Sequence, residues 1–150
     1  MERDGVGWFE GDCVRFAYPS NWTQETERGG DGTTVSLQSA GVTFAIVGVY
    51  DHRQTPDELL EQAIDTLREE HPALELEPLE DDEDAGPDED RLGAELLFLS
   101  LDMLSYCWLE SWRAGDRTVL VMMQSIEPES RLGRAVFRAI CRSLTPIEGE

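Results

Sequence analysis

Several stretches of this chain place apolar side chains on both faces of a predicted strand. They are residues 42–50, 92–101 and 117–125. Within residues 42–50, Phe44 and Ile46 face one way, whereas Val47 faces the other. A strand that is apolar on both faces is stable only where both faces are covered. The chain is therefore expected to hold these strands at the centre of a layered fold, with covering elements above and below the sheet.

Two helical stretches can supply these covers. The first begins at Thr55, whose side chain can cap the helix while Glu58 completes a capping box. His71 precedes a proline and ends this helix, because the residue before proline disfavours helical geometry. The second helix is predicted over residues 128–144, with a broad apolar face and arginines around the other face. One helix on each face is the simplest way to cover the two-sided strands.

The remaining strands complete an α+β fold. Further strands are predicted over residues 14–18, 34–38, 74–78 and 105–113. The polar stretch 24–33 contains glycines and is predicted to be a loop. Runs of neighbouring strands predict a mainly antiparallel sheet of about six to seven strands, with one long helix packed on each face. We expect residues 1–150 to form a single domain.

The charge of the chain excludes several kinds of partner. It carries 32 acidic and 12 basic side chains, a formal net charge of −20. Nucleic-acid binding needs a basic surface, and so does docking on an anionic membrane, so neither partner is expected. Residues 80–90 hold eight of the carboxylates and are predicted to form a mobile, solvated loop. This acidic loop could also bind a cation or an arginine-rich partner, but it lacks the spacing of an EF-hand.

The cysteines and the termini bear on location. Cys13, Cys107 and Cys141 are widely spaced and lie within or beside apolar patterns, which favours buried, reduced thiols. Reduced thiols suit a reducing compartment, and the first residues show no apolar run of signal-peptide length. We therefore predict a cytoplasmic protein, with a trimmed leader as the open alternative.

An aromatic row with one acidic member is the first candidate site. Tyr106, Trp108, Glu110 and Trp112 share one face of the strand over residues 105–113. On an edge strand this row would be a protein-interaction face, since Tyr and Trp concentrate in such surfaces. On a central strand the aromatics would be core, and this interpretation is favoured. Glu110 would then need an arginine partner, and Arg113, Arg117 or an arginine of the last helix could provide it.

A polar cleft near Asp51 and His52 is the second candidate. These residues follow the strand over 42–50, at the crossover to the first helix. Nucleophilic catalysis would need a serine or cysteine and a carboxylate converging on one histidine. The sequence contains no GxSxG, HExxH, Walker or GxGxxG motif. We therefore predict that the protein is not an enzyme, with no catalytic residue, cofactor or metal site assigned.

The chain also resembles the PsbP-like superfamily. The matching features are Phe16, Tyr18-Pro19 and Trp22 in the first strand and turn, the strand over 44–50, the helix start at 55–59 and a late strand pair before a C-terminal helix. That superfamily includes the extrinsic photosystem II protein, a Ran-binding nuclear import factor, DcrB-type lipoproteins and acidic type VI secretion chaperones. The resemblance implies a binding or assembly protein rather than an enzyme, and it assigns no binding residue.

These observations lead to one functional prediction and one alternative. The prediction is a non-enzymatic protein-binding or assembly domain of chaperone type, acting on an unidentified protein partner. The alternative is a small-ligand or cation-binding module that uses Asp51, His52 and the acidic residues 80–90. The sequence leaves a monomer and a homodimer equally open.

Overall fold

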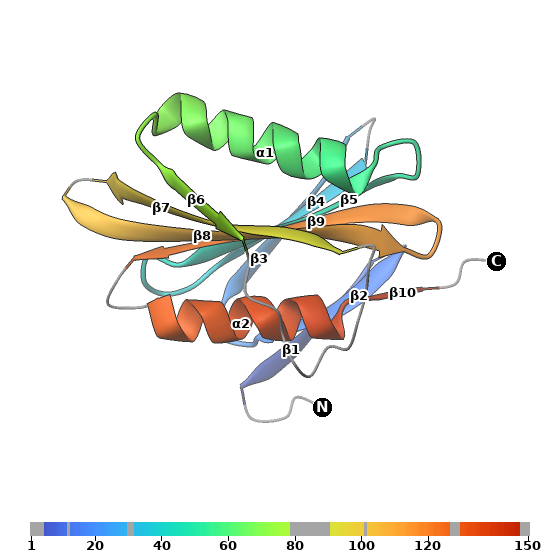
Figure 1. Ribbon diagram of the computed structural model, residues 1–150. Coiled ribbons are helices and arrows are strands. Elements are labelled where there is room, and N and C mark those ends of the chain that lie inside the picture. Colours follow the sequence, from blue (N-terminus) through green and yellow to red (C-terminus); the bar gives the residue numbers. More distant parts are fainter. Residues whose placement is uncertain are drawn as a thin grey trace.

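The structure is a computed structural model (Figure 1) that describes residues 5–11, 13–29, 32–78, 91–100, 102–126 and 130–147. The strands of the larger sheet are β3 (Thr23–Arg28), β4 (Gly32–Gln38), β5 (Phe44–Asp51), β6 (Glu75–Pro78), β7 (Leu92–Ser100), β8 (Met103–Ala114) and β9 (Arg117–Ile126). Those of the smaller sheet are β1 (Val6–Glu10), β2 (Val14–Pro19) and β10 (Thr145–Pro146). The helices are α1 (Pro56–Glu70) and α2 (Ser130–Ser143).

The larger sheet contains seven strands in the order β3-β4-β5-β9-β8-β7-β6. The smaller sheet contains three strands in the order β1-β2-β10. Every pairing within both sheets is antiparallel. The predicted α+β class and the mainly antiparallel sheet of about six to seven strands are confirmed.

The larger sheet separates two apolar cores. Trp108 and Trp112 of β8 point into a core that also includes Phe137 of α2 and Phe16 of β2. Alternate residues of β8, such as Cys107, point into the second core beneath α1. Figure 1 shows α1 above the larger sheet, and α2 below it beside β1 and β2. The α2 side is thus covered by a helix and by the smaller sheet, which the sequence analysis did not anticipate.

The predicted Thr55 cap forms at the start of α1. Thr55 has extended backbone geometry, and its side-chain oxygen accepts a hydrogen bond of 3.3 Å from the backbone N–H of Glu58. The Thr55 hydroxyl in turn donates to Glu58 Oε1 at 3.0 Å. At the other end, the backbone N–H of His71 donates to the Leu67 carbonyl oxygen, which closes the last turn. These contacts satisfy backbone groups that a helix end leaves without intrahelical partners.

One predicted loop is a strand. Residues 24–33 contain most of β3 and the start of β4, where the sequence analysis expected a loop. All six residues of β3 are exposed, so the strand has no apolar face and gives no alternating pattern. β1 and β10 were not predicted either.

The acidic residues 80–90 lie outside the described residues, and so does the start of the predicted second helix at residues 128 and 129. Among the described residues, no helix is long and apolar enough to cross a membrane.

Candidate functional site

Two strands each lie at the edge of a sheet. β3 pairs only with β4, and β1 pairs only with β2. On the other side of each strand, the backbone N–H and C=O groups have no strand partner within the described part of the chain. Backbone groups along such an edge can pair with a further strand.

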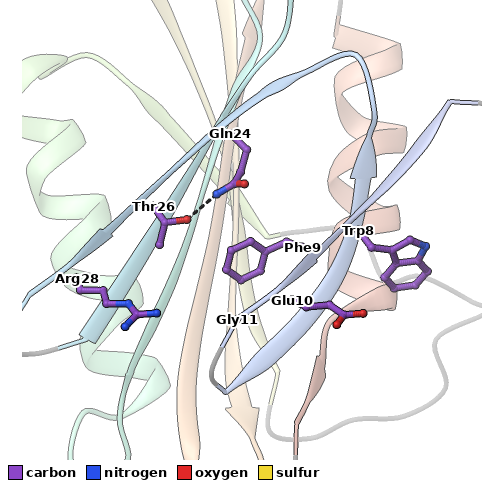
Figure 2. Close-up of a pocket in the computed structure, with 7 residues that line it drawn as sticks. All are labelled: Trp8, Phe9, Glu10, Gly11, Gln24, Thr26 and Arg28. Atoms are coloured by element: carbon purple, nitrogen blue, oxygen red, sulfur yellow. Dashed lines mark hydrogen bonds between the residues drawn. The ribbon is translucent and has the colours of Figure 1, made fainter. Parts of the chain in front are cut away.

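Residues from these two edge strands line a groove of about 580 Å³. Figure 2 shows the residues that line it, which are Trp8, Phe9, Glu10, Gly11, Gln24, Thr26 and Arg28. In that view the Phe9 ring points from β1 toward Gln24 and Thr26 on β3. The groove is therefore a space between the two sheets, open along both strand edges.

The β1 side of the groove has two aromatic residues, of which Phe9 points toward β3 and Trp8 points away from it (Figure 2). The Phe9 ring lies 5.1 Å from the Phe16 ring, centroid to centroid, and this stacking ties it to the core. Trp8 is 50% exposed, and the Arg15 guanidinium lies 4.6 Å from its ring centroid. An exposed tryptophan beside an open groove is typical of protein-binding surfaces.

The β3 side of the groove is polar. Gln24, Thr26 and Arg28 line the groove, and the side chains that alternate with them, including Glu25 and Glu27, point to the other face of the sheet. The Gln24 Nε2 donates a hydrogen bond of 2.5 Å to Thr26 Oγ1, drawn as a dashed line in Figure 2. The strand thus offers hydrogen-bonding groups to the groove and carboxylates to the opposite face.

A small pit opens from the floor of this groove. Its volume is about 60 Å³, and it shares Phe9, Gly11, Thr26 and Arg28 with the groove. The rest of its lining consists of Cys13, Val14, Gly32, Thr33, Val35, Val49 and Arg117. This is several times the ~10–15 Å³ that a single water molecule needs. The pit is therefore large enough for a small side chain.

Two glycines allow the backbone to form this pit. At Gly11, in the turn between β1 and β2, a Cβ would lie 2.8 Å from the Phe9 ring. At Gly32 a Cβ would lie 2.1 Å from the carbonyl oxygen of Val49 on β5. Side chains at these positions would fill the space occupied by the ring or the backbone. The geometry of the pit thus depends on glycine at both positions.

The predicted aromatic row lies largely beneath α2. Trp108 and Trp112 are 1% and 4% exposed and belong to the core, as the favoured interpretation expected. Glu110 forms an ion pair of 2.8 Å with Arg91, which directly precedes β7 and was not among the arginines named from the sequence. Gly93 of β7 is paired with Glu110 in the sheet, and this register explains the choice of partner.

The outer end of this row reaches a groove. Tyr106 and Trp108 contribute to a groove of about 420 Å³ whose other wall includes Arg131, Arg134 and Arg138 of α2. The indole N–H of Trp108 donates a hydrogen bond of 2.7 Å to Glu95, which also lines this groove. The row therefore contributes to the core and to the margin of a basic groove.

Asp51 and His52 lie on an exposed turn. Their side chains are 39% and 68% exposed. The backbone N–H of Arg53 donates to Asp51 Oδ1 at 2.9 Å, and this hydrogen bond is the largest cause of a lowered pKa for Asp51. His52 Nδ1 lies 3.2 Å from the same oxygen. Within the described ranges, no three His, Cys, Asp or Glu side chains are grouped to hold a metal ion.

The cysteines differ in exposure. Cys107 and Cys141 are buried, whereas Cys13 is half-buried at the pit. Burial raises the pKa of Cys107 to about 12. The pKa of Cys141 is raised well above its usual value by burial and by the nearby Glu110 carboxylate. Cys13 is thus the most accessible thiol of the chain.

Comparisons with known proteins identify the fold. No protein-family model matches the sequence, and no curated protein matches it either. Among solved structures, it is similar to the cyanobacterial PsbP protein (CyanoP) of Synechocystis sp. PCC 6803, with a TM-score of 0.67 and 12% identity over 98% of this chain and 95% of that one. It is also similar to the Ran-binding protein Mog1p of Saccharomyces cerevisiae, with a TM-score of 0.63 and 11% identity over 95% of each chain.

The chain has a PsbP/Mog1-like fold. The resemblance predicted from the Tyr18-Pro19 and Trp22 motif is therefore confirmed as a likeness of fold. In this fold, Phe16 and Trp22 are both buried in the core between the sheets and α2. The motif thus marks where the smaller sheet joins the larger one.

Sequence reasoning missed the groove between β1 and β3. Neither strand shows apolar alternation, and β3 is polar throughout. One signal was available, because the predicted loop over residues 24–33 is longer than most connections, whose median is about 4–6 residues. A long polar stretch between two strands therefore favours a hidden edge strand.

Proposed function

We propose that this PsbP/Mog1-like protein is a non-enzymatic protein-binding or assembly domain. In this proposal, an extended segment of a partner protein lies in the groove between β1 and β3. The observation that carries the proposal is the groove itself, which is lined by two strands that each end a sheet. Backbone groups along both edges can bind a peptide with little dependence on its sequence.

The similar structures support a binding role. Mog1p is described as a Ran-binding protein, so at least one protein of this fold binds another protein. With identities of 11% and 12%, the two similarities extend to the fold and to no particular contact. A protein partner and a cytoplasmic location are therefore part of the proposal for this chain.

The alternative function has less support in the geometry. Asp51 and His52 are exposed, and the Asp51 carboxylate already accepts a hydrogen bond from Arg53. Ligand sites are usually concave and shielded from water, and an exposed turn is neither. A small-ligand or cation-binding module at this position is therefore the weaker proposal.

Peptide selection tests the proposed function. Peptides selected from a random library on the wild-type protein would be measured against two matched variants, Thr26→Tyr and Thr23→Tyr. Thr26 lines the groove, whereas Thr23 on the same strand is exposed and is not part of the lining. We expect Thr26→Tyr to weaken binding by about tenfold or more, ~1.4 kcal/mol, with little change for Thr23→Tyr.

Two results would contradict the proposal. Selected peptides that bind both variants as tightly as the wild type would place peptide binding elsewhere on the molecule. Failure to enrich any peptide, with the protein folded by circular dichroism, would remove segment binding as its function.

A further inference from the structure

We propose that the partner segment adds to the outer edge of β3 as a further strand, and that aliphatic and basic residues alternate along it. This inference rests on the proposed function and specifies the binding geometry and the chemistry of the partner. It follows from the open edge of β3 and from the different surroundings of its two faces.

The edge of β3 can accept a strand along its whole length. The strand has six residues, which corresponds to roughly 20 Å of extended chain. All six are exposed, and β4 is the strand's only partner in the described sheet. A segment that pairs here would satisfy its own backbone groups and those of β3.

One face of the added strand would meet the groove, where Phe9 is the aromatic side chain that points toward β3. Gln24, Thr26 and Arg28 of β3 line the groove on this side, and the half-buried Phe9 ring lies opposite them. The pit of about 60 Å³ opens at the same place, beside Val35 and Val49. An aliphatic side chain such as valine on the added strand would lie at the mouth of the pit, on the side of the Phe9 ring, and the hydrophobic effect would favour this contact.

The other face of the added strand would meet carboxylates. Glu25 and Glu27 are exposed on this side of β3, and so are Ser36 and Gln38 on the neighbouring strand β4. Basic side chains on the added strand would lie beside Glu25 and Glu27, and opposite charges on neighbouring strands attract. The formal net charge of −20 also draws a basic segment toward the protein.

A second copy of this chain fits the site less well. β3 itself reads TQETER and has no aliphatic residue to enter the pit. Each copy also carries a formal net charge of −20, so two copies repel each other. The structure therefore favours a segment of a different protein.

Cys13 provides a direct readout of occupancy. It lines the pit and is half-buried, whereas Cys107 and Cys141 are buried in the cores. The rate of Cys13 alkylation by iodoacetamide, followed by mass spectrometry, therefore reports whether the pit is covered. The probe is an alternating Lys–Val peptide of about eight residues, long enough to cover β3. A Glu–Val peptide of the same length is the charge control.

We expect the Lys–Val peptide to slow alkylation of Cys13 and the Glu–Val peptide to leave it unchanged.

Two further peptides test the backbone pairing, one N-methylated at every lysine and the other at every valine. In a strand, the N–H groups of alternate residues point to opposite edges, so only one series can pair with β3. One series should therefore lose protection and the other should keep it.

Charge-reversal variants test the carboxylate face. Glu25→Arg combined with Glu27→Arg should raise the peptide concentration needed for half-protection by about threefold or more. Glu69→Arg combined with Glu70→Arg makes the same change in net charge at the exposed end of α1 and should have a smaller effect.

The outcomes separate this inference from the proposed function. If both N-methylated series protect Cys13 as well as the parent peptide, strand addition is overturned although groove binding stands. If library-selected peptides bind in a Thr26-dependent way but the Lys–Val peptide gives no protection, the alternating pattern is overturned. If no peptide of either kind occupies the groove, both proposals fail.

Discussion

Arg91 and Glu110 form an ion pair that joins the start of β7 to the middle of β8. Arg91 Nη1 lies 2.8 Å from Glu110 Oε1, and the two side chains are 24% and 17% exposed. The Arg91 guanidinium also lies 4.0 Å from the ring centroid of Trp112, on the face of the sheet that packs against α2. A carboxylate in this position is stable because its partner is fixed by both contacts.

We expect Arg91→Ala to lower the free energy of unfolding by about 2 kcal/mol, since it removes the partner of a mostly buried carboxylate. Arg53→Ala is the control, because Arg53 pairs with Asp51 while its side chain is 84% exposed. That variant should change stability by less than about 0.5 kcal/mol. Urea denaturation of the three proteins makes the comparison. Equal losses for the two variants would show that the Arg91 contacts stabilise the fold no more than an exposed ion pair does.

The large sheet and both helices could be predicted because their residues carry clear periodic signals. Alternate residues of β8 and β9 enter different cores, so these strands are apolar on both faces. α1 has a capping residue at Thr55 and a proline directly after His71. In each case the signal is local. A two-sided strand needs burial and a helix end needs a cap, whatever the position of the segment in the fold.

The edges of the fold could not be predicted in the same way. β3 is exposed on both faces, so its side chains are selected for solubility and carry no apolar period. The Arg91–Glu110 pair depends on the register between β7 and β8, which the local sequence does not specify. The candidate groove was missed for the first of these reasons. It lies between β1 and β3, and neither strand has an apolar pattern.

Gly32 sets the separation of β4 and β5 at the floor of the pit. A Cβ there would lie 2.1 Å from the Val49 carbonyl oxygen and 3.1 Å from the Tyr50 Cα, which are backbone atoms and cannot rotate away. We expect Gly32→Ala to cost about 1–3 kcal/mol of unfolding free energy, as overpacking of a core does. Gly29→Ala is the matched control, since its nearest neighbour would lie 3.9 Å away. Thermal denaturation of both variants is the measurement, and an unchanged Gly32→Ala midpoint would contradict the close approach of the two strands.

Trp8 should account for most of the solvent-accessible tryptophan fluorescence. It is 50% exposed, whereas Trp22, Trp108 and Trp112 are 8%, 1% and 4% exposed. We expect Trp8→Phe to remove nearly all of the emission that acrylamide quenches, because a neutral quencher must contact the ring. Trp22→Phe should leave the intensity of the quenchable emission unchanged. Efficient quenching that persists in Trp8→Phe would show that a second tryptophan is open to solvent.

The buried thiol of Cys107 should make stability depend on pH under alkaline conditions. Burial raises its pKa from 9.0 to about 12, so the thiol stays protonated in the folded protein where the unfolded chain ionises. The resulting stabilisation is fully present below pH 9 and is lost as the pH rises toward 12. We expect wild-type unfolding free energy to fall more steeply than that of Cys107→Ala over this window, by up to about 1.4 kcal/mol per pH unit. Urea denaturation across the pH range measures both slopes, which should coincide near neutral pH, and identical slopes above pH 9 would mean that Cys107 ionises freely in the folded protein.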